Sequence, residues 1–589
     1  MAATRRVERI GFDGDLPRII AHPVDEQIVV LRNPDVPFRR DGKHVEGPVV
    51  MTRGGIGYVV GSNRLDARDE SPERAAELVR MKDSMDRGEI TITTPYDIYT
   101  GGLFGDKSKL AIVFTSGGEG SSIGVNNAEV TRELSSTHVV LGAWQGFQAG
   151  VKTTEEFARQ LTVLNDPATT ERMSRTGGST LGMSRTKVRF DSENPEDIEA
   201  AENLFTNVRY VGVVFGNGGG DHTQNFMNLY LKAQAEGASQ IVIGVTPKSM
   251  DNDLAINLND GTIANSLMLG FPTTAYVMRR HFLDEMQSAA GAGRGTVGFF
   301  FGRGAGWTVL GAIRNDMEYR ENMREDGILT ADMENKMDSL GPRTIGLVPE
   351  YPVSIPYFAA SINKIYNEGS IDGQGGEVRD KFVGVAVSEG FMFTELISEF
   401  ERLTREREEG RLTEEIVIEK VSRNDLEDLI EDENVKRIMG ENPEMAKKFF
   451  EQVMKPKLDV WEHPKVDFGP QFVHAVMNSS LTDVPKNNYA EIKYEARTGE
   501  TVPADRALGE VTGRVEAETI RAGRSGVTTV TYEAGEDPLL IDPRKRGASF
   551  IPFEDIAGMS EDQNNLRTLD PNYLRKLGIL IEPHFEMPA

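Results

Sequence analysis

The stretch Pro247-Lys248-Ser249-Met250-Asp251-Asn252-Asp253-Leu254 directly follows an apolar run, Ile241 to Val245, that predicts a buried strand of a parallel sheet. Open α/β sheets bind their ligands in the crevice beyond the carboxyl ends of their strands. The Lys248 cation and the carboxylates of Asp251 and Asp253 are therefore expected at a ligand site. A carboxylate beside a cation stays ionised and can accept a proton from a bound hydroxyl group. Taken alone, two aspartates after a strand also fit a polar loop that caps the strand, so other motifs are needed to distinguish a ligand site from such a loop.

A repeating strand–loop–helix order begins at Leu110 and predicts a parallel sheet with helices on both faces. The apolar runs that predict its strands lie at residues 110–114, 138–141, 211–215 and 241–245. Further runs, which predict a second lobe, lie at residues 296–301, 344–348 and 382–387. Residues 392–470 are rich in charge and poor in strand signals, which predicts a helical insertion. The expected fold class is α/β, with two doubly wound lobes of mainly parallel sheets, a helical insertion and an N-terminal extension.

The composition narrows the class of partner. The chain carries a formal charge of −26, from 92 acidic and 66 basic residues, so nucleic acid and anionic membranes would be repelled. It contains no cysteine, which excludes disulfides, thiol catalysis and cysteine-ligated metals. No apolar run approaches the ~20 residues of a membrane span, and the N-terminus lacks the apolar core of a secretory signal. We expect a soluble, cytoplasmic protein with no nucleic-acid or membrane partner.

Two glycine-rich segments follow predicted strands, and each opens a predicted helix. The first, Thr115 to Ala128, contains Gly117 and Gly118. Glycine lets the backbone turn tightly and approach a ligand, and a helix N-terminus offers unpaired N–H groups to an anion. The second, Gly216 to Gln224, places Asp221 in a glycine cluster, where one carboxylate beside bound phosphates suits Mg²⁺. With the acidic turn, these segments predict a site for phosphates and magnesium.

The order of these motifs resembles that of the phosphofructokinases, over roughly residues 110 to 530. The donor-side segments that carry the resemblance are Thr115 to Ala128, Gly177 to Arg185 (GGSTLGMSR), Gly219 to Thr223 (GGDHT) and Lys248 to Leu254 (KSMDNDL). Those on the acceptor side are Phe301 to Trp307 (FGRGAGW), Pro349 to Pro352 (PEYP) and Tyr494 to Gly499 (YEARTG). The resemblance implies a phosphotransferase of glycolysis that acts on fructose 6-phosphate as a homo-oligomer.

The resemblance implies a role for each matching residue of the donor side. Asp251 is the base for the 1-hydroxyl of the sugar, Asp253 is its electrostatic companion, and Lys248 neutralises the donor. The residues implied to bind the donor phosphates are Gly117, Gly118, Arg185, Gly220 and His222. Asp221 is the implied ligand of Mg²⁺.

A second set of residues is implied to bind the sugar phosphate. It consists of Ser249, Arg294, Phe301, Gly302, Arg303, Glu350, Tyr494 and Arg497. In this set Arg294 and Arg497 hold the 6-phosphate, and Glu350 contacts a sugar hydroxyl. In this family one arginine of the phosphate pocket comes from a neighbouring subunit, so Arg294 implies at least a dimer.

The phosphoryl donor depends on two positions of the motifs. Family members that use pyrophosphate carry an aspartate after the loop aspartate and a lysine three positions before the catalytic base, whereas ATP users carry glycine at the first position. This chain has Lys248, but His222 at the other position matches neither pattern. An imidazole fills the volume of a nucleotide α-phosphate as an aspartate would, and it can donate a hydrogen bond to a terminal phosphate. Pyrophosphate is favoured, with ATP as the alternative.

Two departures from the family pattern concern the sugar pocket. Phe301 replaces a methionine, and Asn488 stands where many relatives carry a second phosphate-binding arginine. These departures leave a non-catalytic regulatory or structural family member as an alternative of another class. The intact Asp251, Asp253 and Arg497 favour catalysis. The expected reaction is phosphoryl transfer from Mg-pyrophosphate to the 1-hydroxyl of fructose 6-phosphate, giving fructose 1,6-bisphosphate.

The motifs and the element pattern together divide the chain into five parts. They are an N-terminal extension (1–105), a lobe for the donor phosphates (106–290), the first part of a sugar-phosphate lobe (291–391), the helical insertion (392–470), and the rest of that lobe with a C-terminal tail (471–589). For the extension, a role in packing or assembly is expected.

Overall fold

The structure, a computed structural model, describes residues 95–100, 107–165, 167–367, 381–455, 468–482, 486–492, 496–560 and 564–583. Outside these ranges it gives the backbone of short strands. They are β1 (Ile19–Ile20), β2 (Ile28–Leu31), β3 (Val50–Thr52), β4 (Gly55–Ile56), β5 (Tyr58–Val59), β6 (Ile90–Thr93), β16 (Ser370–Ile371) and β17 (Glu377–Val378). Helix α2 (Pro95–Thr100) leads into the first lobe.

The larger lobe is built on a ten-stranded sheet in the order β22-β12-β13-β20-β11-β10-β7-β8-β9, with β21 beside β20. Its strands are β7 (Leu110–Thr115), β8 (Val139–Ala143), β9 (Leu161–Val163), β10 (Val213–Gly218), β11 (Val242–Pro247), β12 (Ala255–Leu258), β13 (Ile263–Leu267), β20 (Gly526–Tyr532), β21 (Ser549–Pro552) and β22 (Ile556–Ser560). Strands β8, β7, β10, β11 and β20 run parallel to one another. Antiparallel strands extend this parallel centre at both edges.

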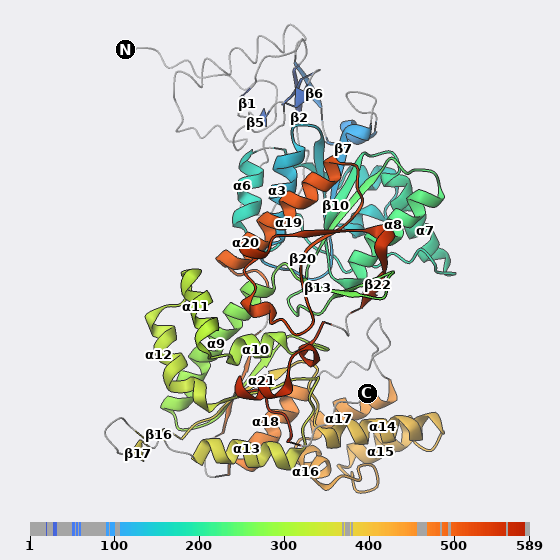
Figure 1. The fold of residues 1–589 in the computed structure, drawn as a ribbon. Coiled ribbons are helices and arrows are strands. Elements are labelled where there is room, and N and C mark those ends of the chain that lie inside the picture. The colour runs from blue at the N-terminus through green and yellow to red at the C-terminus, as the bar shows by residue number, and fades with distance from the viewer. Residues whose placement is uncertain are drawn as a thin grey trace, which may run out of the picture.

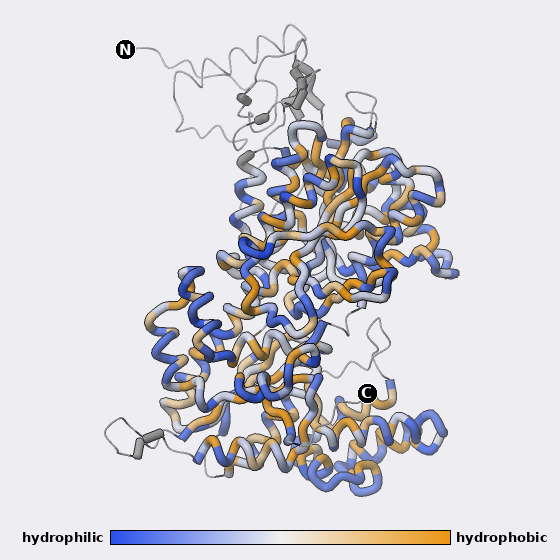
Figure 2. Tube along the Cα trace, in the orientation of Figure 1, coloured by the Kyte–Doolittle hydropathy of each residue, from blue (hydrophilic) through white to orange (hydrophobic). Residues whose placement is uncertain are grey.

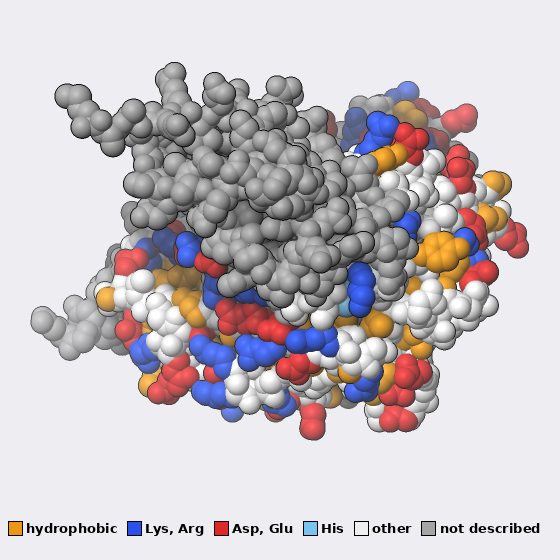
Figure 3. Space-filling model, turned by 90° about the horizontal axis from the view of Figure 1, so that it is seen from above, with side chains coloured by type: hydrophobic (Ala, Val, Ile, Leu, Met, Phe, Trp, Pro, Cys, Tyr) orange, Lys and Arg blue, Asp and Glu red, His pale blue; other side chains and the backbone are white. Residues whose placement is uncertain are grey.

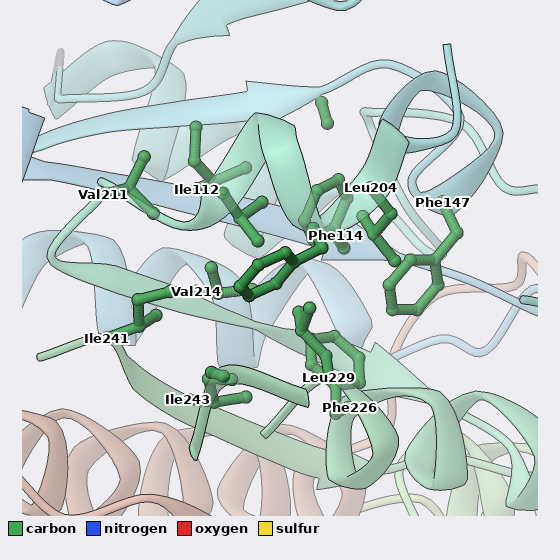
Figure 4. Close-up of a cluster of buried hydrophobic side chains, with 14 of the residues drawn as sticks. Ile112, Phe114, Phe147, Leu204, Val211, Val214, Phe226, Leu229, Ile241 and Ile243 are labelled. Carbon is green, nitrogen blue, oxygen red and sulfur yellow. The ribbon is translucent and has the colours of Figure 1, made fainter. Parts of the chain in front are cut away.

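Strand β7 explains why helices cover both faces of this sheet. Its side chains alternate, so Ile112 and Phe114 enter one buried apolar cluster while Ala111 and Val113 enter another. Phe114 stacks on Phe147 in the first cluster, with the ring centroids 5.0 Å apart (Figure 4). The helices of the first face are α4 (Phe147–Gly150), α5 (Thr154–Ala158), α7 (Pro195–Val208) and α8 (Gly220–Ala235). Those of the other face are α3 (Ile123–Leu134), α6 (Pro167–Arg175) and α19 (Pro503–Arg521) (Figure 1).

The smaller lobe contains a four-stranded parallel sheet in the order β15-β18-β14-β19. Its strands are β14 (Thr296–Phe300), β15 (Thr344–Leu347), β18 (Gly384–Ser388) and β19 (Asn488–Glu491). Its helices are α9 (Phe271–Gly291), α10 (Trp307–Ile313), α11 (Met317–Glu325), α12 (Ala331–Leu340), α13 (Ile355–Asn367), α18 (Gly469–Ser480) and α21 (Pro571–Lys576). The second α/β lobe that the sequence predicts is thereby confirmed.

The charge-rich segment after β18 is helical, as its sequence predicts. It forms α14 (Thr394–Glu408), α15 (Glu414–Ser422), α16 (Glu433–Glu441) and α17 (Pro443–Met454). Leu396, Phe400 and Leu403 recur at helical spacing and are buried in the apolar cluster that also covers the smaller sheet. The insertion therefore packs onto the smaller lobe.

The C-terminal part of the chain lies in both lobes, which differs from the expected division at residue 471. Helix α19 packs on α3, and β20 pairs with β11 in the centre of the larger sheet. Strand β22 pairs with β12 at its edge. Residues 503–560 therefore complete the larger sheet, because β20 satisfies the N–H and C=O groups along the edge of β11.

The described surface is polar and mixed in charge. Figure 2 shows that hydrophilic residues recur on the outer turns of the helices. Acidic and basic side chains are intermingled on the described part of the face in Figure 3. Among the described residues, no helix has the length and apolar character that crossing a membrane requires.

Candidate active site

Three loops open side by side at the carboxyl ends of β7, β10 and β11. Strands β7 and β10 are in register, with Asn217 opposite Thr115. Backbone hydrogen bonds continue this alignment, because Ser116 N donates to Asn217 O at 3.0 Å. On the other side, Lys248 N donates to Gly218 O at 2.9 Å. The two glycine loops and the acidic turn are thus brought together where an open α/β sheet binds its ligand.

The acidic turn depends on Asn252, whose φ of 53° lies in the left-handed region. Asparagine enters this region more readily than most residues. Its amide also secures the turn: Nδ2 donates to Tyr532 Oη at 3.0 Å, and Oδ1 accepts from Met268 N at 3.1 Å. Because Asn252 stands between Asp251 and Asp253, its conformation sets the direction of both carboxylates.

The two aspartates of the turn differ in their partners. Asp253 Oδ1 accepts a 2.7 Å hydrogen bond from Ser249 Oγ, whereas Asp251 Oδ1 is buried and has no hydrogen-bond partner among the described residues. Burial raises the pKa of Asp251, and the charges of Asp253 and Glu389 raise it further. Burial also raises the pKa of Asp253, against the effect of the Ser249 hydrogen bond. Asp251 is therefore the carboxylate with an open acceptor atom, which is what a general base requires.

Lys248 lies between the acidic turn and the first glycine loop. Its ammonium is buried and donates to Gly118 O. Gly117, with a φ of 95°, makes room for it, since a Cβ there would lie 2.7 Å from Lys248 Nζ. Burial lowers the pKa of Lys248 to about 8, and the Glu119 carboxylate opposes this shift. Lys248 thus brings a cation to the loop where donor phosphates are expected.

The segment around Arg185 packs against the first glycine loop. Gly117 N donates to Ser184 O at 2.7 Å, and Ser179 N donates to Glu119 Oε2 at 2.8 Å. Burial raises the pKa of Glu119, and the Ser179 hydrogen bond opposes that rise. Arg185 follows Ser184 directly and is exposed. Its guanidinium therefore lies on the solvent side of the crevice.

His222 lies in the first turn of α8 and is only 5% exposed. Its ring is stacked near Phe147, with the centroids 6.4 Å apart, and a Cβ on Gly117 would lie 3.4 Å from its Nδ1. Burial lowers its pKa to about 3, assisted by the charges of Lys248 and Lys187, so the imidazole is neutral. His222 Nε2 is buried without a hydrogen-bond partner among the described residues.

Asp221 precedes His222 at the start of α8, which begins at Gly220. Its carboxylate is ion-paired, with Lys187 Nζ 2.5 Å from Asp221 Oδ2. No group of three or more His, Asp or Glu side chains that would hold a metal occurs in the part of the chain that the structure describes. One carboxylate already paired with an ammonium does not fit a metal bound directly by the protein. Magnesium at Asp221 stays a prediction that this pair opposes.

Arg497 reaches the donor side of the crevice. Its guanidinium lies over the Phe301 ring, 4.5 Å from the centroid, in a cation–π arrangement. A Cβ on Gly118 would lie 3.5 Å from Arg497 Nη1. Its charge opposes the rise in the pKa of Asp251 that burial causes. The structure therefore brings Phe301 and Arg497 together beside the glycine loop and the acidic turn, and their contacts with a sugar phosphate stay predictions.

Gly302 and Arg303 follow β14 in the smaller lobe. Gly302 has a φ of 117°, and a Cβ there would lie 2.2 Å from Ala305 O, so the turn requires glycine. Arg303 Nε is 3.6 Å from Oε1 of Glu389, which directly follows β18. The charges of Arg303 and Glu389 both act on Asp251. The strand ends of the smaller lobe thus face the acidic turn of the larger one.

Glu350, the expected ligand of a sugar hydroxyl, is buried among backbone groups. Its Oε1 accepts from Gly306 N at 2.8 Å and from Leu566 N at 2.9 Å. Burial raises its pKa, and these hydrogen bonds oppose the rise. Glu350 therefore ties β15 to the turn after β14, and a contact with the sugar stays a prediction.

Arg294 and Tyr494 do not join the group within one described chain. Arg294 precedes β14 and its Nη1 donates to Lys486 O at 3.5 Å, at the opposite end of the strand from Arg303. A role of Arg294 in the site of a neighbouring subunit stays a prediction. Tyr494 lies outside the described residues.

Sequence reasoning assigned no role to Glu119, Lys187 or Glu389. Glu389 had a usable signal, because it directly follows a buried strand as the acidic turn does. Glu119 occupies the acidic position of the first phosphate loop, and Lys187 follows Arg185 by two residues. Their partners lie far away in the chain, so their contacts are visible only in the structure.

No family model and no curated protein matches the chain. Among solved structures, it is similar to the pyrophosphate-dependent phosphofructokinase of Marinobacter aquaeolei, with 15% identity and a TM-score of 0.49, over 81% of this chain and 94% of that one. The pyrophosphate-dependent phosphofructokinase of Nitrosospira multiformis has 16% identity and a TM-score of 0.47, over 81% of this chain and 94% of that one. Pichia pastoris phosphofructokinase in the T-state has 15% identity and a TM-score of 0.46, over 82% of this chain and 40% of that one. All three of these solved structures are of phosphofructokinases.

Proposed function

We propose that this protein transfers a phosphoryl group from pyrophosphate to the 1-hydroxyl of fructose 6-phosphate, giving fructose 1,6-bisphosphate in glycolysis. The observation that carries the proposal is the open, buried Oδ1 of Asp251 in a turn lined by the Lys248 and Arg497 cations. Phosphoryl transfer depends on positioning and on neutralising charge more than on covalent help. The crevice offers both, with the motif order of a phosphofructokinase.

In the proposed reaction Asp251 accepts the proton of the 1-hydroxyl. The oxygen then bonds to the terminal phosphorus of pyrophosphate, and the bond from that phosphorus to the bridging oxygen breaks. Orthophosphate leaves with the electron pair. Lys248 and Arg185 neutralise the donor, while Asp253, which accepts a hydrogen bond from Ser249, is the electrostatic companion of the base.

The buried imidazole of His222 supports pyrophosphate as the donor. A nucleotide needs room for a third phosphate next to the glycine loop. The ring of His222 lies beside Gly117 and is packed near Phe147, so it fills space at that point. Because the imidazole is neutral, the ring fills this volume without adding a charge of its own that would attract a further phosphate.

On the acceptor side, Arg497 and Arg303 supply cations for the sugar phosphate. Arg294 lies at the far end of β14 and acts on the site of a neighbouring copy, so the working enzyme is at least a dimer in the cytoplasm. A homo-oligomer is expected by size-exclusion chromatography with light scattering.

The test of the proposed base is Asp251→Asn. We expect a loss of turnover of about 10²-fold or more, because general base catalysis is worth roughly 10²–10⁴-fold. Asp191→Asn, at an exposed aspartate, is the matched control and should retain full turnover. Full activity of Asp251→Asn would refute the proposal.

A further inference from the structure

The ion pair of Lys187 and Asp221 occupies the edge of the donor site. The two side chains are 29% and 23% exposed, and Lys187 Nζ itself is buried. Among the described residues, Lys187 is the only cation within ion-pair distance of Asp221. The pair is thus only partly exposed to solvent.

Lys187 belongs to a group of three cations around His222. Burial is the largest cause of the low pKa of that imidazole, and the charges of Lys248, Lys187 and Arg185 lower it further. Lys187 follows Arg185 by two residues, on the segment that packs against the first glycine loop. The ammonium is therefore within reach of any phosphate that enters between this loop and α8.

The position of Lys187 conflicts with a metal held permanently by Asp221. An ammonium at 2.5 Å already neutralises the carboxylate, and a divalent cation would meet that positive charge at close range. Magnesium in phosphate sites is usually held by one or two carboxylates together with substrate phosphates. A phosphate donor supplies both the missing ligands and a new partner for the ammonium.

We propose that Lys187 is a built-in counter-ion of Asp221, which keeps divalent cations off the empty site until a phosphate donor draws the ammonium away. The proposal deepens the proposed function, on which it rests for the identity of the donor. In this proposal Lys187 binds the donor, and the metal enters the site only when the donor is bound.

The test measures binding of Mn²⁺ to the full-length protein by electron paramagnetic resonance, with no donor present. Lys187→Met frees the Asp221 carboxylate, and we expect Mn²⁺ to bind at least about fivefold more tightly than to the wild type. Lys187→Arg keeps a cation at the carboxylate and should stay within about twofold of the wild type. Unchanged affinity in Lys187→Met would overturn the proposal.

Two controls locate the effect. Arg185→Met removes one positive charge from the same site but leaves the ion pair intact, so Mn²⁺ affinity should change by less than about twofold. Adding Asp221→Asn to Lys187→Met should abolish the gain. A gain that survives this second substitution, or that equals the gain of Arg185→Met, would mean that the pair does not govern metal entry.

The last arm adds methylenediphosphonate, a pyrophosphate analogue that is not cleaved. The wild type and Lys187→Met should then bind Mn²⁺ with affinities within about twofold, because the analogue holds the ammonium away from Asp221. A difference as large as that without the analogue would overturn the displacement. None of these readouts needs turnover, so they hold or fail independently of the proposed reaction.

Discussion

Ser249 Oγ donates a 2.7 Å hydrogen bond to Oδ1 of Asp253. The same hydroxyl oxygen accepts from Asp251 N at 3.1 Å, while Asp251 Oδ1 has no hydrogen-bond partner in the part of the chain that the structure describes. One hydroxyl thereby makes two neighbouring carboxylates chemically different. Asp253 accepts the hydrogen bond of this hydroxyl, and Asp251 keeps an atom open for a proton.

The pH dependence of turnover should reveal this difference. Burial, Asp253 and Glu389 raise the pKa of Asp251, and a base must be deprotonated to act, so kcat/KM should fall as pH falls through that raised pKa. Asp253→Asn removes a like charge, which lowers the pKa of Asp251 and moves the acidic limb to lower pH. The check is a profile of kcat/KM between about pH 5 and 9. An acidic limb that does not move would show that the two carboxylates are not coupled.

Asn252 should be required for the shape of the acidic turn. Asn252→Ala places a residue that tolerates the left-handed region less well than asparagine at this position, and it removes the bonds to Tyr532 Oη and Met268 N, at a cost of about 2–4 kcal/mol in the free energy of unfolding. Asn252→Gly relieves the backbone strain and loses only the hydrogen bonds of the side-chain amide. Its free energy of unfolding should therefore lie between those of the alanine variant and the wild type. Chemical denaturation measures both, and kcat should follow the same order. Equal stability of alanine and glycine variants would contradict the role of the backbone conformation.

His222 should control the choice of donor. His222→Gly opens the volume beside Gly117 and Phe147, so turnover with ATP should appear while turnover with pyrophosphate falls severalfold. Initial rates with each donor at equal enzyme concentration provide the measurement. If ATP use is the same before and after the substitution, His222 does not close the nucleotide site.

The buried carboxyl of Glu516 should make stability depend on pH. It lies on α19, and its Oε2 accepts from Thr246 Oγ1 at 2.7 Å. Burial raises its pKa from 4.5 to about 8, against the Thr246 hydrogen bond, so the folded state holds a proton that the unfolded state releases. Its contribution to stability is fully present below about pH 4.5 and is lost as pH rises through about 8.

Glu516→Gln keeps a hydrogen-bonding group without a titrating proton. The Tm of this variant should therefore decline less than that of the wild type between about pH 5 and 9. Glu510→Gln, at a partly exposed position of the same helix, should decline as the wild type does. Parallel Tm profiles for Glu516→Gln and the wild type would contradict the assignment.

Much of the fold can be predicted from local sequence, and the elements that cannot be predicted depend on distant parts of the chain. The runs Leu110–Phe114 and Ile241–Val245 predicted β7 and β11 because a strand buried on both faces is continuously apolar. Strands β12, β13 and β22 were not predicted. They are short antiparallel strands, and the pairings of β13 with β20 and of β12 with β22 join segments far apart in the chain.

The sequence predicts which loops form the candidate site, but not which of their side chains form ion pairs. Parallel strands end at one edge, so Lys248, Asp251 and His222 were expected near one another, and the structure places their loops together. The pairing of Lys187 with Asp221 depends on how a segment without regular structure passes over α8. No spacing rule predicts such contacts.

The most direct test of the central claim is turnover of fructose 6-phosphate by the wild type with pyrophosphate and, separately, with ATP. The account predicts formation of fructose 1,6-bisphosphate with pyrophosphate, and little or none with ATP, because His222 fills the space that a nucleotide needs. Turnover with ATP alone would contradict the donor assignment, and no turnover with either donor would contradict the proposed function.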